Sequence, residues 1–239
     1  MDTGHLLVAD LDGTLLGDDA ALARLVEWLQ PQRDRYRIVY ASGRHLDSVL
    51  DVIDRTALLQ PDAVVSAVGT EIHDPAGRPW PGWLERFDGW TGDGVRQALR
   101  SLKWLVPQTD SAQTGRTASD DVAGLAPADL DSVRRTLSAA GLPSTLVYSC
   151  SLHLDVLPAT GGKGHAARFL ANAWAVAPEN VLVFGDSGND LQMFEQGFRG
   201  TIVANALPEL GRAVGHDVYR SPLAYADGVL DGLRHWSAA

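Results

Sequence analysis

Leu6-Leu7-Val8-Ala9-Asp10-Leu11-Asp12-Gly13-Thr14 is an apolar run that ends in two carboxylates and a glycine. Four successive apolar residues bounded by turn residues are typical of a strand buried on both faces, as in a parallel sheet. Asp10 and Asp12 would lie just past the carboxyl end of that strand, at the edge where open α/β sheets bind their ligands. The stretch therefore predicts a parallel sheet and places a functional site at its edge.

Strand-like and helix-like runs alternate in the first and last thirds of the chain. Either Asp18 or Asp19 can cap a helix whose apolar stripe is Leu22, Leu25, Val26 and Leu29. Further strands are predicted at residues 37–41, 63–67, 181–184 and 201–203. This α/β alternation indicates a Rossmann-like, doubly wound parallel sheet with helices on both faces.

A different substructure interrupts this rhythm after residue 79. The turn at 74–77 is followed by helix-like segments at 93–102 and 127–140 and by strand-like segments at 146–148 and 152–157. The strand–helix pattern resumes at Lys163. We therefore predict a split core domain, residues 1–79 and 158–239, with a smaller α+β cap domain inserted at residues 80–157.

Composition excludes several classes of function. The 239 residues carry a net charge of −10, which argues against nucleic acid as a partner, because such binding needs clustered Lys and Arg. Cys150 is the single cysteine, so neither an intrachain disulfide nor a thiolate metal cluster is expected. The sequence has no apolar segment near the ~18 residues of a membrane span and no basic stretch like that of a secretion signal. We expect a cytoplasmic protein that does not bind membranes and is a monomer or weak dimer.

The two carboxylates suit phosphoryl transfer. A phosphate monoester repels anions, so its attack needs a nucleophile held in line and positive charge on the phosphoryl oxygens. We assign Asp10 as the nucleophile that forms an aspartyl-phosphate, and Asp12 as the acid that protonates the leaving group and then activates water. The alternative is that Asp-Leu-Asp-Gly is only a capped turn.

A second acidic cluster, Gly185-Asp186-Ser187-Gly188-Asn189-Asp190, follows the predicted strand at 181–184. It would therefore open onto the same sheet edge as the first cluster. Magnesium prefers hard oxygen ligands, usually one or two carboxylates together with water and substrate phosphate. We assign Mg²⁺ as the cofactor, with candidate ligands Asp10, Asp12, Asp186 and Asp190. Taken alone, the cluster could also be an Asx-turn with a helix cap.

Two further motifs supply groups for binding an anion. Ser42-Gly43-Arg44 ends the strand at 37–41, where a hydroxyl and successive N–H groups can bind phosphate oxygens. Lys163 begins a predicted helix, an unfavourable place for a cation unless an anion lies nearby. Ser42 could instead be an ordinary cap, and Lys163 an exposed loop lysine. Because four such motifs meet at one sheet edge, the sequence predicts a magnesium-dependent phosphatase.

The motifs resemble, in order, the four motifs of the haloacid dehalogenase superfamily, and the resemblance spans nearly the whole chain. Within that superfamily the chain looks most similar to sucrose-phosphate phosphatases, through the segments 40–44, 67–72, 162–164 and 185–190. The resemblance implies that Asp10 is the nucleophile and Asp12 the acid and base. It also implies that Ser42 and Lys163 bind phosphate and that Asp186 binds the metal.

The resemblance further implies a site for the sugar phosphate. We expect the substrate to be bound by Gly43, Arg44, Gly69, Glu71, Arg116 and Asn189. Where sucrose-phosphate phosphatases tend to carry a lysine followed by Ile-Ser-Tyr, this chain has Arg116-Thr117-Ala118-Ser119. Because arginine makes a fork of hydrogen bonds and lysine a point contact, the contact to the sugar would differ, unless Arg116 is simply solvated.

The implied reaction is the hydrolysis of sucrose 6-phosphate to sucrose and phosphate. Mannosylfructose phosphate and glucosylglycerate phosphate are alternative substrates, and a broad sugar-phosphate phosphatase is a further alternative. A sugar-phosphate synthase is a candidate partner. The non-enzyme alternative is a silent sugar-phosphate-binding partner of a glycosyltransferase, but such a protein would not need both Asp10 and Asp12.

Overall fold

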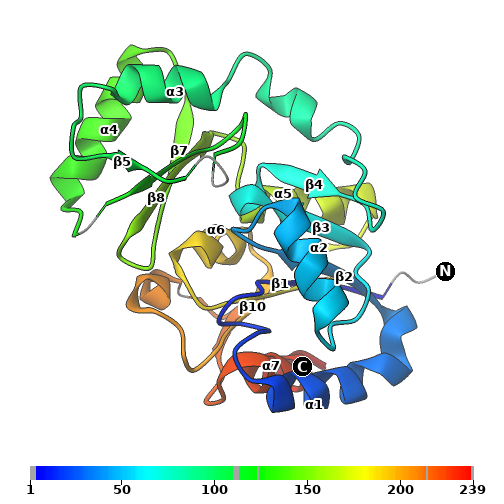
Figure 1. Ribbon diagram of the computed structural model, residues 1–239. Helices are drawn as coiled ribbons and strands as arrows, with labels where there is room; N and C mark the ends of the chain where they lie inside the picture. Colours follow the sequence, from blue (N-terminus) through cyan, green and yellow to red (C-terminus); the bar gives the residue numbers. More distant parts are fainter. Residues whose placement is uncertain (1–3, 110–112, 123, 214, 238–239) are drawn as a thin grey trace.

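The chain folds into two sheets of different size, each with its own helices. The computed structural model describes residues 4–109, 113–122, 124–213 and 215–237. One sheet has seven strands and the other four. Figure 1 shows the smaller sheet, in green, with its helices beside the larger part of the molecule. The predicted α/β core with an α+β cap is confirmed.

The seven-stranded sheet is parallel except at one edge. Its order is β11 (Val218–Arg220), β10 (Arg199–Ile202), β9 (Val181–Gly185), β1 (His5–Ala9), β2 (Tyr36–Ala41), β3 (Ala63–Ser66) and β4 (Glu71–His73). The described strands run parallel, apart from β4, which pairs antiparallel with β3. Strand β1 lies in the middle, between β9 and β2, so the residues that follow these three strands share one edge.

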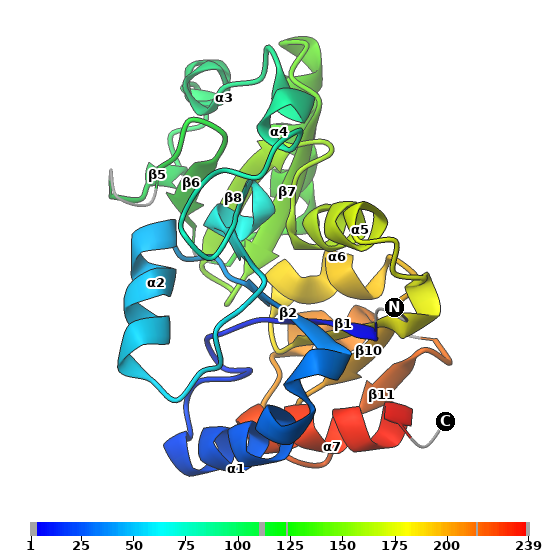
Figure 2. The same ribbon diagram turned by 90° about the vertical axis from the view of Figure 1, so that its right-hand side faces the viewer.

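Helices cover both faces of this sheet, as the alternation of buried side chains in β1 requires. Leu7 and Ala9 pack against α1 (Asp19–Leu29), α2 (Leu46–Arg55) and α7 (Tyr225–Ser237). Leu6 and Val8 point to the other face and pack with α5 (Lys163–Ala173) and α6 (Leu191–Phe194). Figure 2 shows α1 and α7 below the sheet and α5 above it.

The cap is an antiparallel sheet with two helices on one face. Its order is β5 (Val106–Pro107), β6 (Ala118–Asp121), β8 (His153–Pro158) and β7 (Ser144–Ser149). Side chains alternate along β8: Leu154 and Val156 pack with α3 (Gly92–Leu99) and α4 (Pro127–Ala139), while His153 and Asp155 face the opposite way. The face without helices is therefore polar and turned toward the core domain.

Short 3₁₀ helices complete the connections. They are η1 (Gln30–Arg35), η2 (Ala67–Gly69), η3 (Leu84–Phe87), η5 (Pro178–Asn180), η6 (Gly188–Asp190) and η7 (Pro208–Arg212). Trp83 and Phe87 are buried in the core cluster of the larger sheet, although they lie beyond the predicted boundary at residue 79. The boundaries of the cap at residues 80 and 157 stay a prediction. In the described part of the chain, no helix is both long enough and apolar enough to cross a membrane.

Prediction on helix α1. Asp18 is its N-cap, because Asp18 Oδ1 accepts a hydrogen bond from Ala21 N at 3.0 Å. Replacing Asp18 with Ala leaves that N–H without its acceptor and lowers the free energy of unfolding by about 1 kcal/mol. Urea denaturation checks this value. Asp19→Ala is the matched control: Asp19 lies in the first turn and contributes only its charge, about 0.3–0.5 kcal/mol. Equal losses in the two variants would contradict the assignment.

Candidate active site

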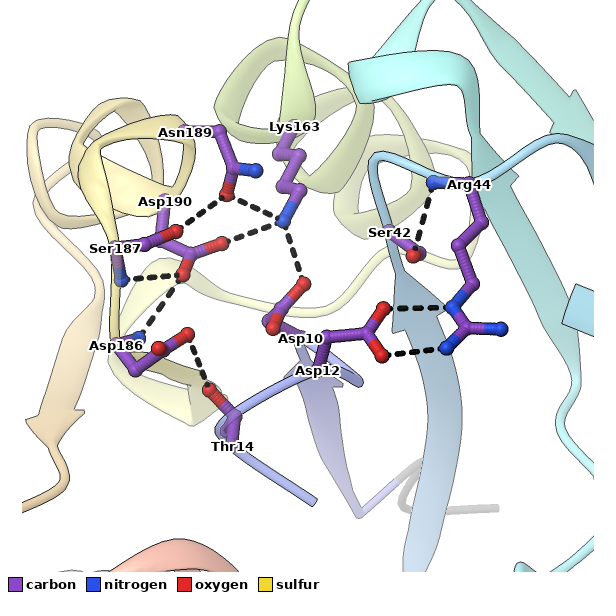
Figure 3. A network of polar contacts seen from close by, with 10 residues as sticks. All are labelled: Asp10, Asp12, Thr14, Ser42, Arg44, Lys163, Asp186, Ser187, Asn189 and Asp190. Carbon is purple, nitrogen blue, oxygen red and sulfur yellow. Dashed lines mark hydrogen bonds and ion pairs between the residues drawn. The ribbon is translucent and has the colours of Figure 1, made fainter. Parts of the chain in front are cut away.

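The three motif loops meet at the carboxyl edge of the central strands. The register pairs Ala9 of β1 with Tyr40 of β2 and with Phe184 of β9. Asp10, one residue on, donates its N–H to the carbonyl of Phe184 at 3.1 Å. Figure 3 shows the side chains of these loops converging beside the first residue of α5, Lys163.

Lys163 is the centre of this cluster. Its side chain is fully buried, and its Nζ donates to Asp10 Oδ1, Asp190 Oδ1 and Asn189 Oδ1, each at 2.7 Å. Three acceptors satisfy the three donors of an ammonium group, which explains how a buried lysine is tolerated here. The contacts hold the Asp10 carboxylate in one orientation, with Oδ1 turned to Lys163.

Asp190 is a positioning residue for the loop that carries Asp186. Its Oδ1 accepts from Lys163, while its Oδ2 accepts from the N–H groups of Asp186 and Ser187 at 3.0 and 3.2 Å. Gly185 permits this close packing, because a Cβ at that position would lie 2.5 Å from Cβ of Asp190. Both oxygens of Asp190 are thus engaged by the protein.

Asp186 approaches the first motif from the other side. Thr14 Oγ1 donates to Asp186 Oδ1 at 3.3 Å. Gly13 lies between them with φ of +84°, and a Cβ there would come within 2.4 Å of Asp186 Oδ2. Both the backbone conformation and the space therefore require glycine at position 13. The described residues donate no hydrogen bond to Oδ2 of Asp10 or Oδ2 of Asp186.

Burial and charge strongly perturb the groups of this cluster. Burial raises the pKa of Asp10 well above its usual range, and Lys163 only partly offsets this effect. Burial and the neighbouring Asp190 raise the pKa of Asp186 to about 7. Burial alone would lower the pKa of Lys163, but the carboxylates of Asp10 and Asp190 outweigh it and raise the pKa. Three carboxylates thus share one ammonium, which leaves an excess of negative charge.

This excess fits a hard divalent cation. Carboxylate oxygens of Asp10, Asp186 and Asp190 lie within 4.8 Å of one another, and all three residues are buried. Such an all-oxygen group suits Mg²⁺ better than a softer metal. Because both oxygens of Asp190 are engaged, the contacts favour Asp10 and Asp186 as the carboxylates that would touch the ion. The side chain of Asp12, another predicted ligand, lies outside this group.

Asp12 instead pairs with Arg44 on the β2 side of the site. Arg44 donates from Nε to Asp12 Oδ2 at 2.7 Å and from Nη2 to Asp12 Oδ1 at 2.6 Å, a two-pronged pair visible in Figure 3. Ser42, at the end of β2, is buried and accepts from the backbone N–H of Arg44 at 3.1 Å. The side chain of Asp12 remains more than half exposed, so substrate and water can reach it.

A cavity of about 300 Å³ lies between this edge of the core and the polar face of the cap. Core residues of the predicted site form its floor: Asp10, Asp12, Gly43, Arg44, Asp186 and Asn189. The cap contributes Gln108, Thr117, Ser119, His153 and Asp155. Ser119 donates to Asp155 Oδ1 at 2.5 Å, and burial raises the pKa of Asp155. The cavity therefore has a charged floor and a hydrogen-bonding roof.

Ser42 and Lys163, predicted to bind phosphate, are buried and do not line this cavity. Three residues predicted to bind the sugar phosphate do not line it either. Gly69 packs against the start of α5, where a Cβ would lie 2.2 Å from the carbonyl carbon of Gly162. Glu71 accepts from Ser66 Oγ at 3.4 Å. Arg116 is half-buried and donates to the carbonyl of Trp90. Their assignment to the substrate stays a prediction, and the structure favours a supporting role for each.

The roof residues Gln108, Ser119 and Asp155 were missed in the sequence. The signal that could have found them is the polar residues at alternate positions, 153 and 155 on β8 and 119 and 121 on β6, which pair with each other. However, the sequence of β6 is too polar to be recognised as a strand.

Comparison with known proteins places this geometry in a family. A family model described as sucrose-6F-phosphate phosphohydrolase matches residues 3–237. The chain belongs to the sucrose-6F-phosphate phosphohydrolase family. Its relatives include mannosylfructose-phosphate phosphatase of Agrobacterium fabrum, 34% identical over 97% of this chain and 96% of the relative. The phosphohydrolase family lies within the haloacid dehalogenase superfamily, and the chain is a sugar-phosphate phosphatase, a phosphoric monoester hydrolase.

Two further similarities support membership of the sucrose-6F-phosphate phosphohydrolase family. A solved structure of the sucrose-phosphatase of Synechocystis sp., in complex with sucrose and phosphate, matches with a TM-score of 0.93 and 32% identity, over 99% of each chain. Sucrose-phosphatase 1 of Nicotiana tabacum is 30% identical over 97% of this chain, which spans 59% of that relative. The chain thus spans only about three-fifths of the length of this plant relative.

Prediction on Asp186. Its carboxyl has a higher pKa in the folded protein than in the unfolded chain, so in metal-free protein it destabilises the fold as pH rises from about 4 through about 7. Asp186→Asn removes that charge but keeps an acceptor for Thr14. We expect the variant to be more stable than the wild type at pH 8, by about 1–2 kcal/mol, and equally stable near pH 4. Urea denaturation in a chelator measures both; a gain that is the same at both pH values would contradict the raised pKa.

Proposed function

We propose that the protein is a Mg²⁺-dependent phosphatase that hydrolyses a glycosyl-sugar phosphate, with sucrose 6-phosphate as the preferred substrate. The observation that carries this proposal is the pairing of buried Lys163 with Asp10, which lies on the floor of a cavity that has a polar roof. A single orientation of the Asp10 carboxylate, fixed through Oδ1, leaves Oδ2 as the attacking atom. The reaction then proceeds through an aspartyl-phosphate on Asp10.

The chain's own groups account for the charge and the protons. Lys163 neutralises Asp10 and reduces the repulsion between its carboxylate and the phosphate dianion. Ser42 and the N–H groups that follow β2 hold phosphoryl oxygens, as does the amide of Asn189. Asp12 donates the proton to the departing sugar oxygen and afterwards accepts one from the attacking water. Arg44 orients Asp12 for both steps through its two-pronged contact.

Asp10 and Asp186 would hold the cofactor, with Asp190 and Thr14 fixing them in place. When bound, Mg²⁺ supplies positive charge to the phosphoryl oxygens. The single ammonium of Lys163 does not balance the charge of three carboxylates, so it does not supply this charge alone. The raised pKa values of Asp10 and Asp186 support this assignment, because they reflect burial first and then neighbouring carboxylates that lack enough countercharge.

The cap suits the sugar part of the substrate. Ser119, His153 and Asp155 line the roof with hydroxyl, ring-nitrogen and carboxylate groups, the partners that sugar hydroxyls need. The similarity to a sucrose-phosphatase solved with sucrose and phosphate supports sucrose 6-phosphate. The mannosylfructose-phosphate phosphatase at 34% identity makes mannosylfructose phosphate the second candidate. Glucosylglycerate phosphate and a broad sugar-phosphate range are weaker candidates.

A synthase partner and a cytoplasmic location also stay proposals. One relative is a glucosylglycerol-phosphate synthase of Pseudomonas anguilliseptica, 29% identical over 97% of this chain, which spans 30% of that relative.

Prediction on Asp10. Asp10→Asn removes the nucleophile and lowers kcat for phosphate release from sucrose 6-phosphate in Mg²⁺ by about 10³-fold or more. Unchanged thermal unfolding shows that the variant is folded, and Asp19→Asn, on the exposed first turn of α1, is the matched control. Equal activity of Asp10→Asn and wild type would refute the mechanism. No activity in the wild type, on any sugar phosphate tested, would favour the silent binding protein.

Prediction on specificity. We expect kcat/KM for sucrose 6-phosphate to exceed that for mannosylfructose phosphate, as the proposed function requires. The two esters differ only in the glycosyl unit, so contacts with the cap would set the difference in kcat/KM. A difference of about 10-fold or more corresponds to one or two hydrogen bonds to sugar hydroxyls. The reverse order would make mannosylfructose phosphate the substrate, and comparable values for unrelated esters would indicate a broad phosphatase.

A further inference from the structure

A chain of threonine hydroxyls crosses from the cap to the core beside the cavity. Thr114 Oγ1 donates to Thr117 Oγ1 at 3.0 Å, and Thr117 Oγ1 lies 3.0 Å from Thr70 Oγ1. Thr70 Oγ1 in turn donates to the carbonyl of Ala67 at 2.9 Å. A hydroxyl has one hydrogen, and Thr70 uses its own for Ala67, so Thr117 must donate to Thr70. The chain therefore has one direction, from cap to core.

The hydrogen bond between Thr70 and Thr117 joins the cap to the core at a buried position. Thr70 and Thr117 are both buried, with 0% and 1% of their surface exposed. A buried hydroxyl that loses its partner is costly, so the pair resists separation. By contrast, another cap–core contact, from the N–H of Ser151 to Glu209 Oε1 at 3.0 Å, is exposed to solvent.

Residues on both sides of the hydrogen bond between Thr70 and Thr117 form walls of the cavity. Thr117 lines it from the cap, and Ala67 and Val68 line it from the core. Ala67 and Val68 have φ of +48° and +56°, a conformation that residues with a Cβ rarely adopt, so their loop needs support from its neighbours. The hydrogen bond from Thr70 to Ala67 is part of that support.

The core end of the chain is fixed independently of the cap. Trp83 Nε1 donates to the carbonyl of Thr70 at 3.1 Å, and the N–H of Gly162 donates to the carbonyl of Gly69 at 3.2 Å. The cap end is held by contacts within the cap, among them one from the N–H of Gly92 to the carbonyl of Gly115 at 3.0 Å and one from Arg116 to the carbonyl of Trp90. Breaking the hydrogen bond between Thr70 and Thr117 would thus remove a buried link between the cap wall and the core, and it would leave the contact between Lys163 and Asp10 in place.

From this arrangement we propose that Thr70 and Thr117 are positioning residues for specificity. Their hydrogen bond sets the cap wall against the core loop 67–70, and so fixes where the glycosyl unit lies relative to Asp10. The inference rests on the proposed function for the identity of the substrate, but the hydrogen bonds between the threonine hydroxyls do not depend on it. A small ester that does not reach the cap is much less sensitive to the pair than a disaccharide phosphate.

The test compares Thr→Val, which removes the hydroxyl at equal size, with Thr→Ser, which keeps it. We expect Thr117→Val and Thr70→Val each to lower the ratio of kcat/KM for sucrose 6-phosphate to that for p-nitrophenyl phosphate by about 10-fold, mainly through KM. Thr117→Ser and Thr70→Ser restore it to within about twofold, and the Val/Val double variant is no worse than either single one. Thr136→Val is the matched control, because Thr136 Oγ1 donates to the carbonyl of Ser132 within α4 and does not line the cavity.

Thr70→Val is decisive, since Thr70 does not line the cavity and acts only through its partners. Equal losses with both esters, or additive losses in the double variant, would overturn the proposal. Hydrogen exchange supplies a readout that needs no substrate: Thr70→Val, a change in the core, speeds amide exchange in the cap segment 113–119, and Thr70→Ser does not. Unchanged exchange there overturns the proposal, whereas a wild type inactive on sucrose 6-phosphate refutes only the proposed function.

Discussion

The ammonium of Lys163 joins three parts of the chain that are far apart in sequence. It lies at the start of α5 and bonds to Asp10 after β1 and to Asn189 and Asp190 after β9, at 2.7 Å each. Removing a charge from water costs several kcal/mol, so a buried lysine persists only where its partners repay that cost. In the proposed mechanism one of these partners, Asp10, is also the nucleophile, so the ion pairs that stabilise the edge of the sheet would orient the chemistry as well.

Much of the surrounding sequence follows from that contact. Asp190 can reach Lys163 with one oxygen and hold the 186–187 amides with the other only because position 185 is glycine. Gly13 in turn makes room for Asp186. Burial, together with neighbouring carboxylates, raises the pKa of Asp10 and of Asp186, and the excess of carboxylates over cations supports the proposal of a divalent ion. In the proposed function, the charged groups of the floor bind the phosphate and the hydrogen-bonding groups of the roof bind the sugar.

The core could be predicted from sequence because its signals are local. Apolar runs such as 6–9 and 181–184 form central strands, and motifs at their ends meet by topology alone. The cap was harder: β6, with the sequence Ala-Ser-Asp-Asp, is a strand only because β5 and β8 pair with it on either side. Helix α7 was not predicted at all, although it covers much of one sheet face. Glu71 and Arg116 were assigned to the substrate by analogy, but they lie outside the cavity. Short motifs do not reveal which way a side chain points, so the sequence could not exclude these residues.

The central claim is that Lys163 holds Asp10 by Oδ1 so that Oδ2 receives the phosphoryl group. Trifluoroberyllate, which binds carboxylates as an acyl-phosphate analogue, tests it most directly in a crystal structure of the wild-type protein with Mg²⁺. The account predicts beryllium bonded to Oδ2 of Asp10, with Lys163 still on Oδ1. Beryllium on Asp12 or on any other carboxylate would contradict it.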